Sequence, residues 1–226
     1  MRKIISILLL LIPFVTFSQE YYYPIAVELS HPDLVIKRIS FNDKNTVVEL
    51  SITNKMMGGW FCADRNIYLF NTVENKRYNL KGSNNIPNCP DKYMFKRVGE
   101  RLEFALFFDK IENHGERIDL IEDCNNSCFY FKGILLNNSK NRDIHLFETS
   151  VVQYESGNIK QAEVNFKKII SNIPDHPTHV YGFAYSYLYK IALKKGDNNL
   201  AEKWKAEFIG TNLPNKDFYL ENFVAD

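Results

Sequence analysis

The chain has 226 residues, with 28 lysines and arginines against 27 aspartates and glutamates. A hydrophobic fraction of 45% and an aromatic fraction of 14% argue against intrinsic disorder, and the length suffices for one large or two small domains. The formal net charge of +1 gives no reason to expect a nucleic-acid partner, because phosphate binding requires clustered positive charge.

Residues 1–18 have the pattern of a secretory signal peptide. The basic pair Arg2-Lys3 precedes an apolar stretch that runs to Phe17, and small residues mark a cleavage site after Ser18. The apolar stretch is shorter than the roughly 20 residues that a membrane span needs. The sequence therefore predicts an exported protein, periplasmic or extracellular, with no integral membrane span after cleavage. An uncleaved N-terminal anchor is the alternative.

Four cysteines follow, at Cys62, Cys89, Cys124 and Cys128. In an exported chain four cysteines most often form two disulfides, for which three pairings exist. The turn-forming residues between Cys124 and Cys128 make these two the easiest pair, which leaves Cys62 with Cys89. The crossed pairings stay open. A zinc site would need two CxxC-like motifs, so we expect no metal and no cofactor.

Strand-like alternation dominates residues 24–138. In one segment Val48, Leu50 and Ile52 alternate with more polar neighbours, a pattern typical of half-buried strands. The predicted strands cover residues 34–41, 46–53, 66–72, 77–80, 101–109, 117–122 and 128–136. Turn-forming clusters separate them, and we therefore predict an antiparallel β-sandwich whose strand order the sequence does not reveal.

The hydrophobic period lengthens to three or four in residues 143–226. Ala162, Phe166 and Ile169 share one helical stripe, and a similar stripe follows Leu200. Residues 180–193 carry alternating aromatic side chains, but their length and the stop signal that follows favour a helix. The predicted fold class is therefore α+β, with a β-sandwich followed by a helical domain.

Two segments of the helical region share one frame, in which Gly157 precedes Ala162 and Gly196 precedes Ala201. This pattern resembles the tetratricopeptide repeat, whose helical hairpins turn at a glycine and cross at an alanine. The resemblance implies a short domain of stacked hairpins, with a generic pair of α-hairpins as the alternative. Two repeats need further support, which could come from the β region, from the tail Lys216–Val224 acting as a cap, or from another chain.

The same resemblance implies a groove lined by one stripe of the first helix of each hairpin. By frame, these residues are Phe147, Val151 and Tyr154, followed by Phe183 and Lys190. Such an apolar groove would bind a peptide or pack on the β-sandwich.

The β region more loosely resembles an immunoglobulin-like module of exported bacterial proteins. The residues that carry this resemblance are Tyr78-Asn79-Leu80, Ile118–Glu122 and Cys128–Ile134. It implies a fold and a compartment, and it implies no activity.

The sequence contains no Gly-rich phosphate loop, no HExxH motif and no nucleophile elbow, so we expect no enzyme. His176 and His179 flank Pro177, which indicates a loop or a helix start rather than a metal site. Trp60 and Phe61 follow a Gly-Gly turn. They could stack on a sugar, but a tryptophan more often fills the core, and we expect this of Trp60.

Glu122 and Asp123 are expected to be solvated charges at a strand end. The leading hypothesis is an exported, non-enzymatic protein that binds a protein or peptide through the tetratricopeptide-like groove. The alternative is a carbohydrate-binding module on the sandwich, using Trp60 and Phe61. An enzyme whose site is assembled from dispersed residues is a weaker third hypothesis.

Overall fold

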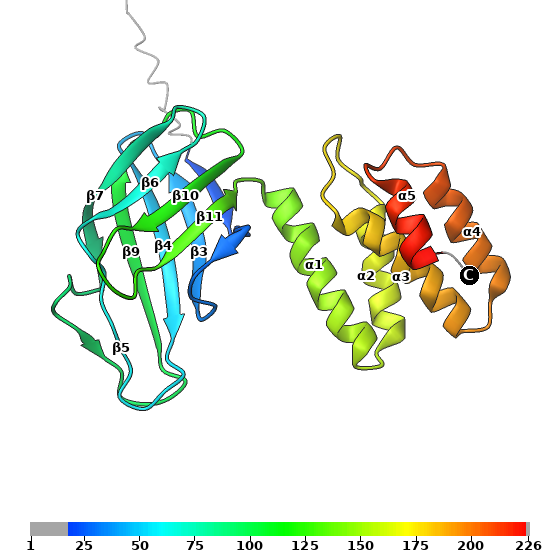
Figure 1. Cartoon of the computed structure of the whole chain (residues 1–226), viewed down its shortest axis with the longest axis horizontal. Coiled ribbons are helices and arrows are strands. Elements are labelled where there is room, and N and C mark those ends of the chain that lie inside the picture. Colours follow the sequence, from blue (N-terminus) through cyan, green and yellow to red (C-terminus); the bar gives the residue numbers. More distant parts are fainter. Residues whose placement is uncertain (1–17, 225–226) are drawn as a thin grey trace, which may run out of the picture. The chain divides into compact units, whose positions relative to one another are not determined.

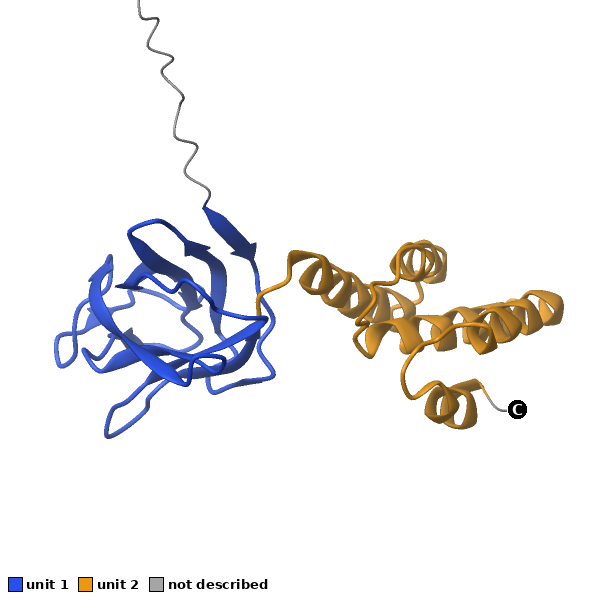
Figure 2. Cartoon of the chain, turned by 90° about the horizontal axis from the view of Figure 1, so that it is seen from above, with its two compact units in different colours: residues 1–134 blue, residues 135–226 orange. Residues whose placement is uncertain are grey.

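The computed structural model describes residues 18–224, so the predicted signal peptide lies almost wholly outside the described residues. The chain forms two compact units that divide after Ile134 (Figure 2). The first contains the strands and the second contains the helices (Figure 1). This confirms the α+β class, with an antiparallel sheet followed by a helical region.

Nine strands of the first unit, called the β unit here, form one sheet in the order β1-β3-β4-β9-β7-β6-β10-β11-β2. Their bounds are β1 Gln19–Tyr22, β2 Glu28–Leu29, β3 Leu34–Phe41, β4 Asn45–Thr53, β6 Ile67–Asn71, β7 Lys76–Asn84, β9 Arg101–Asp109, β10 Arg117–Glu122 and β11 Tyr130–Leu135. Two short strands, β5 (Trp60–Phe61) and β8 (Tyr93–Met94), pair separately.

The two halves of the nine-stranded sheet share strand β7. Its first half pairs with β6, where Tyr78 lies opposite Leu69, and its second half pairs with β9, where Ser83 lies opposite Leu106. A register irregularity just after Leu80 separates the two halves and bends the strand. The layers predicted as a sandwich are therefore one continuous curled sheet, a half-barrel whose edge strands β1 and β2 do not pair with each other.

The core of the β unit follows the alternation in the sequence. Leu102, Phe104, Leu106 and Phe108 of β9 are all buried, and the residues between them are not. Each buried side chain of this size contributes roughly 1.5–3 kcal/mol through the apolar area that it removes from water. The period-two prediction for this strand is confirmed residue by residue.

The four cysteines form the disulfides Cys62–Cys89 and Cys124–Cys128, which is the pairing that the short spacing favours. The first bond ties the end of β5 to a segment that lies beside it, where the Cys89 backbone N–H donates to the Ala63 carbonyl at 3.0 Å. The second bond closes the turn between β10 and β11. Both bonds therefore hold connecting loops rather than the central strands.

The second unit, called the helical unit here, contains α1 (Asn138–Glu155), α2 (Ile159–Ile170), α3 (Val180–Lys194), α4 (Asn198–Ile209), α5 (Lys216–Tyr219) and a π-helical turn η1 (Leu220–Val224). Consecutive long helices pack on each other, α1 on α2, α2 on α3 and α3 on α4. Helix α1 begins at Asn138, five residues before the predicted start of the helical region at residue 143, because the Asn137 side chain caps it by accepting from the Lys140 N–H at 3.0 Å.

Glycine and alanine occupy the positions in the hairpins that their chemistry suits. Gly157 and Gly196 follow α1 and α3 with φ angles of +86° and +74°, a region that side chains disfavour. Ala162 and Ala201 are fully buried where the paired helices meet. The alternating aromatic run in α3 is a helix, as its length predicted.

Candidate functional site

A cavity of about 880 Å³ lies within the β unit, and we call it the Trp60 cavity. Its walls come from four segments that are distant in sequence, within residues 31–33, 52–64, 89–95 and 122–127. The volume lies in the range of sites that enclose small ligands. Connecting loops build most of its wall, and binding residues usually lie on loops that a rigid scaffold holds in position.

The disulfides give this cavity a stable wall. Cys62, Cys89 and Cys124 all line it, so both bonds border the same space. The Cys62–Cys89 bond ties two wall segments, residues 52–64 and 89–95, to each other, and the Cys124–Cys128 bond closes the turn that forms a third part of the wall. The Ala63 N–H also donates to the Pro87 carbonyl at 3.0 Å, which adds a hydrogen bond beside the first disulfide.

Trp60 is 47% exposed at this cavity, so the expectation of a core tryptophan is wrong. The reason is local, since Trp60 lies on β5, which pairs only with β8 and stands outside the nine-stranded sheet. Phe61, the next residue, turns inward and packs 5.8 Å from Phe104 and 6.1 Å from Phe129, measured between ring centroids. The short strand therefore presents one aromatic side chain to the core and one to solvent.

The turn before Trp60 is fixed by Asn54. Its side-chain N–H₂ donates to the carbonyls of Met56 and Arg97, both at 2.8 Å. Gly59 packs so closely on this side chain that a Cβ would lie 2.1 Å from Asn54 Oδ1. Glycine is required at this position because any other residue would displace Asn54 and, with it, the loop that carries Trp60.

The two lysines that line the Trp60 cavity already have partners. The Lys92 ammonium lies 3.9 Å from the centroid of the Trp60 ring, in cation–π geometry. The Lys55 ammonium lies 3.7 Å from a carboxylate oxygen of Asp33. Lys92 thus covers one face of the Trp60 indole.

Glu122 is only 6% exposed, so the expectation of a solvated strand-end charge is wrong for this residue. Its carboxylate accepts the backbone N–H groups of Asp64 at 2.7 Å and Phe129 at 3.0 Å, which joins two loops of the cavity wall. Burial raises the pKa of Glu122, and these two hydrogen bonds oppose the rise. No ion pair to Glu122 is found within residues 18–224.

The predicted groove residues of the helical unit come together. The Phe147 ring lies 6.0 Å from Phe183 and 6.0 Å from Tyr187, and Tyr154 lies 5.1 Å from Tyr187. Val151 is half-buried on the same helix as Phe147. Tyr187 was absent from the prediction, although its spacing of four from Phe183 could have revealed it.

The tail covers part of this aromatic row. Phe223 lies 5.3 Å and Tyr219 5.0 Å from Phe183, and the Lys190 ammonium lies 5.0 Å from the Phe223 ring. Phe183 and Lys190 are therefore in contact with the chain's own C-terminal segment. Within residues 18–224, no ring contact joins Phe147, Tyr154 or Tyr187 to the tail.

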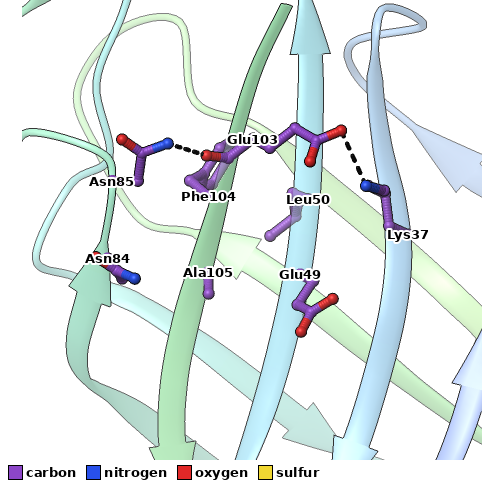
Figure 3. Close-up of a pocket in the computed structure, with 8 residues that line it drawn as sticks. All are labelled: Lys37, Glu49, Leu50, Asn84, Asn85, Glu103, Phe104 and Ala105. Atoms are coloured by element: carbon purple, nitrogen blue, oxygen red, sulfur yellow. Dashed lines mark hydrogen bonds and ion pairs between the residues drawn. The ribbon is translucent and has the colours of Figure 1, made fainter.

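A second, shallower hollow of about 460 Å³ lies on the face of the sheet (Figure 3). It arises where the small Ala105 stands opposite Glu49 on β4. The charged side chains around it are paired within the sheet, Lys37 with Glu103 at 2.9 Å and Glu49 with Arg38. Because these charged side chains already pair on the surface of the sheet, the hollow gives no reason to place a ligand there.

His176 and His179 lie apart from any ligand-like cluster. His176 is exposed in the loop before α3, and His179 immediately precedes this helix, with its ring 6.1 Å from Phe183. Within residues 18–224, no group of three or more His, Cys, Asp or Glu side chains is arranged to hold a metal ion. None of the helices in this part of the chain is long and apolar enough to cross a bilayer.

Comparisons of the chain with protein-family models, with curated proteins and with solved structures gave no match.

Proposed function

We propose that this chain is an exported, non-enzymatic binding protein whose β unit holds a carbohydrate in the Trp60 cavity. The observation that carries the proposal is a half-exposed tryptophan at the wall of a cavity large enough for a sugar unit. The apolar C–H face of a sugar ring stacks on an indole, while its hydroxyl groups need polar partners. His31, Asn125 and Asn126 line the same cavity and offer such partners.

Export is supported by the cysteines and by the predicted signal peptide. Every described cysteine is in a disulfide, which is typical of proteins that fold in an oxidising compartment outside the cytoplasm.

A binding role rather than catalysis is supported by the hydrogen bonds that the acidic side chains of the cavity make. Both oxygens of Glu122 accept backbone N–H groups, and Asp64 Oδ1 accepts the Asn66 N–H at 2.8 Å. These carboxylates hold loops in place.

Intrinsic fluorescence tests the carbohydrate proposal, because the chain has two tryptophans and Trp204→Phe leaves Trp60 as the single reporter. We expect the emission of this variant to shift during titration with at least one member of a panel of neutral and acidic oligosaccharides. Trp60→Ala should abolish binding measured by calorimetry, and Lys92→Ala should strengthen it by freeing the second face of the indole. Phe218→Ala, an exposed aromatic residue of the helical unit, is the matched control. No response to any glycan of the panel contradicts the proposal.

A second candidate function is the binding of a protein or peptide by the helical unit, which resembles tetratricopeptide hairpins. The observation that favours it is the aromatic row of Phe147, Tyr154 and Tyr187, whose side chains are half-buried rather than buried. Aromatic side chains bury much area at low entropic cost, which makes them the usual anchors of such interfaces.

Affinity capture from the native envelope fraction tests this second candidate. We expect a partner that is retained by the wild-type chain, lost with Tyr154→Asp and retained with Val152→Asp, which places the same charge at an exposed position of the same helix. Equal recovery with both variants contradicts a role for the aromatic row.

A further inference from the structure

The β unit carries a cluster of exposed apolar side chains at one end, which we call the apolar tip. Its members are Met56 (66% exposed), Met57 (80%), Trp60 (47%), Met94 (55%) and Val98 (50%). They come from the loop after β4, from the small β5–β8 pair and from the loop before β9. In Figure 1 these loops meet at the lower end of the β unit, beside β5. Large apolar side chains gathered in this way mark a contact surface more often than scattered ones do.

The apolar tip is rigid, so its exposure is built into the fold. Asn54 bonds through its side chain to both loops, and its backbone carbonyl accepts the Gly99 N–H at 2.8 Å. The Phe95 N–H donates to the Gly59 carbonyl at 2.9 Å, which joins the loops a second time. Because these bonds fix the backbone, the methionines cannot turn inward without breaking them.

Basic side chains surround the apolar tip. Residues 54–60 and 91–100 contain four lysines and arginines, namely Lys55, Lys92, Lys96 and Arg97, against the two acids Asp91 and Glu100. Glu100 is already engaged, since it accepts from the Tyr93 hydroxyl at 2.8 Å and from the Lys96 backbone N–H at 2.6 Å. Lys55 pairs with Asp33, 3.7 Å away, which leaves Lys92, Lys96 and Arg97 against Asp91 and Glu100. The tip therefore combines apolar side chains with an excess of one positive charge.

We propose that the apolar tip docks on the surface of a membrane that carries anionic lipid headgroups. Met57 and Val98 would enter the interfacial layer, Trp60 and Met94 would lie at headgroup level, and the basic side chains would contact phosphates. Tryptophan is enriched at this level of a bilayer. Lysine is depleted in protein–protein interfaces but is attracted to anionic lipid surfaces, so the charge around the tip favours a membrane over a protein partner.

Vesicle flotation with the mature full-length chain tests this proposal, with phosphatidylcholine vesicles compared with vesicles that also contain phosphatidylglycerol. We expect binding to the anionic vesicles that weakens as salt is added, because exposed charges are screened. Lys96→Ala with Arg97→Ala should lower the partition coefficient roughly twenty-five-fold, since each cation near an anionic surface contributes about a fivefold factor. No binding of the folded wild-type chain to anionic vesicles overturns the proposal.

A charge-insertion pair separates the tip from the Trp60 cavity. Met57→Asp with Val98→Asp changes two tip residues that do not line the cavity, so it should abolish flotation and leave any glycan titration unchanged. Val73→Asp is the control, because Val73 is also exposed but lies away from the tip. The nearby Asn71 side chain donates to the carbonyl of Asn113, which follows β9, whereas the tip residue Val98 precedes β9. Circular dichroism and thermal unfolding verify that the variants fold. Undiminished flotation of the double variant, or a protein partner captured through the tip in place of lipid, refutes membrane docking.

Discussion

Replacing Gly182 with alanine should destabilise the helical unit, although alanine is the better helix former. Gly182 lies inside α3, and a Cβ built on it would lie 2.6, 2.7 and 2.8 Å from three ring atoms of Tyr219. Such distances are far inside van der Waals contact, and the ring is held from its other sides. Tyr219 packs 5.0 Å from Phe183 and 6.1 Å from Phe208, measured between ring centroids. The tail must therefore move away from α3 to admit the methyl group.

The expected change in the free energy of unfolding is the difference between a cost and a gain. Displacing Tyr219 exposes a side chain that is 6% accessible, and re-exposure of a large apolar residue costs roughly 1.5–3 kcal/mol. Alanine in place of glycine inside a helix recovers about 1 kcal/mol. We therefore expect Gly182→Ala to lower the free energy of unfolding by about 0.5–2 kcal/mol, measured by urea denaturation, and to make the tail more sensitive to protease.

A double-mutant cycle decides whether this reasoning is right. In a Tyr219→Ala background the ring is gone, so Gly182→Ala should instead stabilise the chain by about 1 kcal/mol. The effect of one substitution thus changes sign with the residue opposite it. An effect of the same sign and size in both backgrounds would refute the conclusion that Gly182 is required for tail packing.

Three further predictions concern the stability of the two units. Replacing Cys62 and Cys89 by serine should lower the free energy of unfolding by about 3.5 kcal/mol in the chain-entropy model, given their sequence separation of 27, and should weaken ligand binding in the cavity; denaturation with and without reductant checks this. Because burial raises the pKa of Glu122, the folded state binds more protons than the unfolded state between the ordinary and the raised value. Stability should therefore fall as pH rises through that window, and Glu122→Gln should remove this slope in denaturation series at stepped pH. Tyr181→Phe should cost about 1.5–3 kcal/mol in urea unfolding, because it removes the buried 2.6 Å hydrogen bond that the Tyr181 hydroxyl donates to the Asp143 carboxylate.

Local patterns predicted the strands and helices in which the buried residues recur at a regular spacing. In β9 every second residue is buried, as alternation requires, and in α2 Ala162, Phe166 and Ile169 form the buried stripe that their spacing indicates. Local spacing also favoured the Cys124–Cys128 pair, because these cysteines flank a turn, whereas only the structure excluded the crossed pairings. These features depend on neighbours that are close in sequence.

The candidate site depended on contacts between distant segments, and local patterns were misleading there. Trp60 was expected in the core because tryptophan is usually buried, yet β5 lies outside the main sheet and turns it outward. Glu122 was expected in solvent because it ends a strand, yet backbone N–H groups of Asp64 and Phe129 close over its carboxylate. No periodicity within the sequence encodes either arrangement.

The sequence by itself determined the fold class and the alternating and helical stripes, because each of these reflects the chemistry of residues a few positions apart. Only the tertiary structure decided that β7 joins the two halves of the sheet, that the disulfide-tied loops enclose a cavity, and that the tail covers Phe183. The physical reason is that a cavity or an exposed tip is defined by which distant segments meet and which side chains they leave uncovered. Hydrogen bonds between distant segments, such as the one from Asn54 to Arg97, 43 residues further along the chain, determine which segments meet.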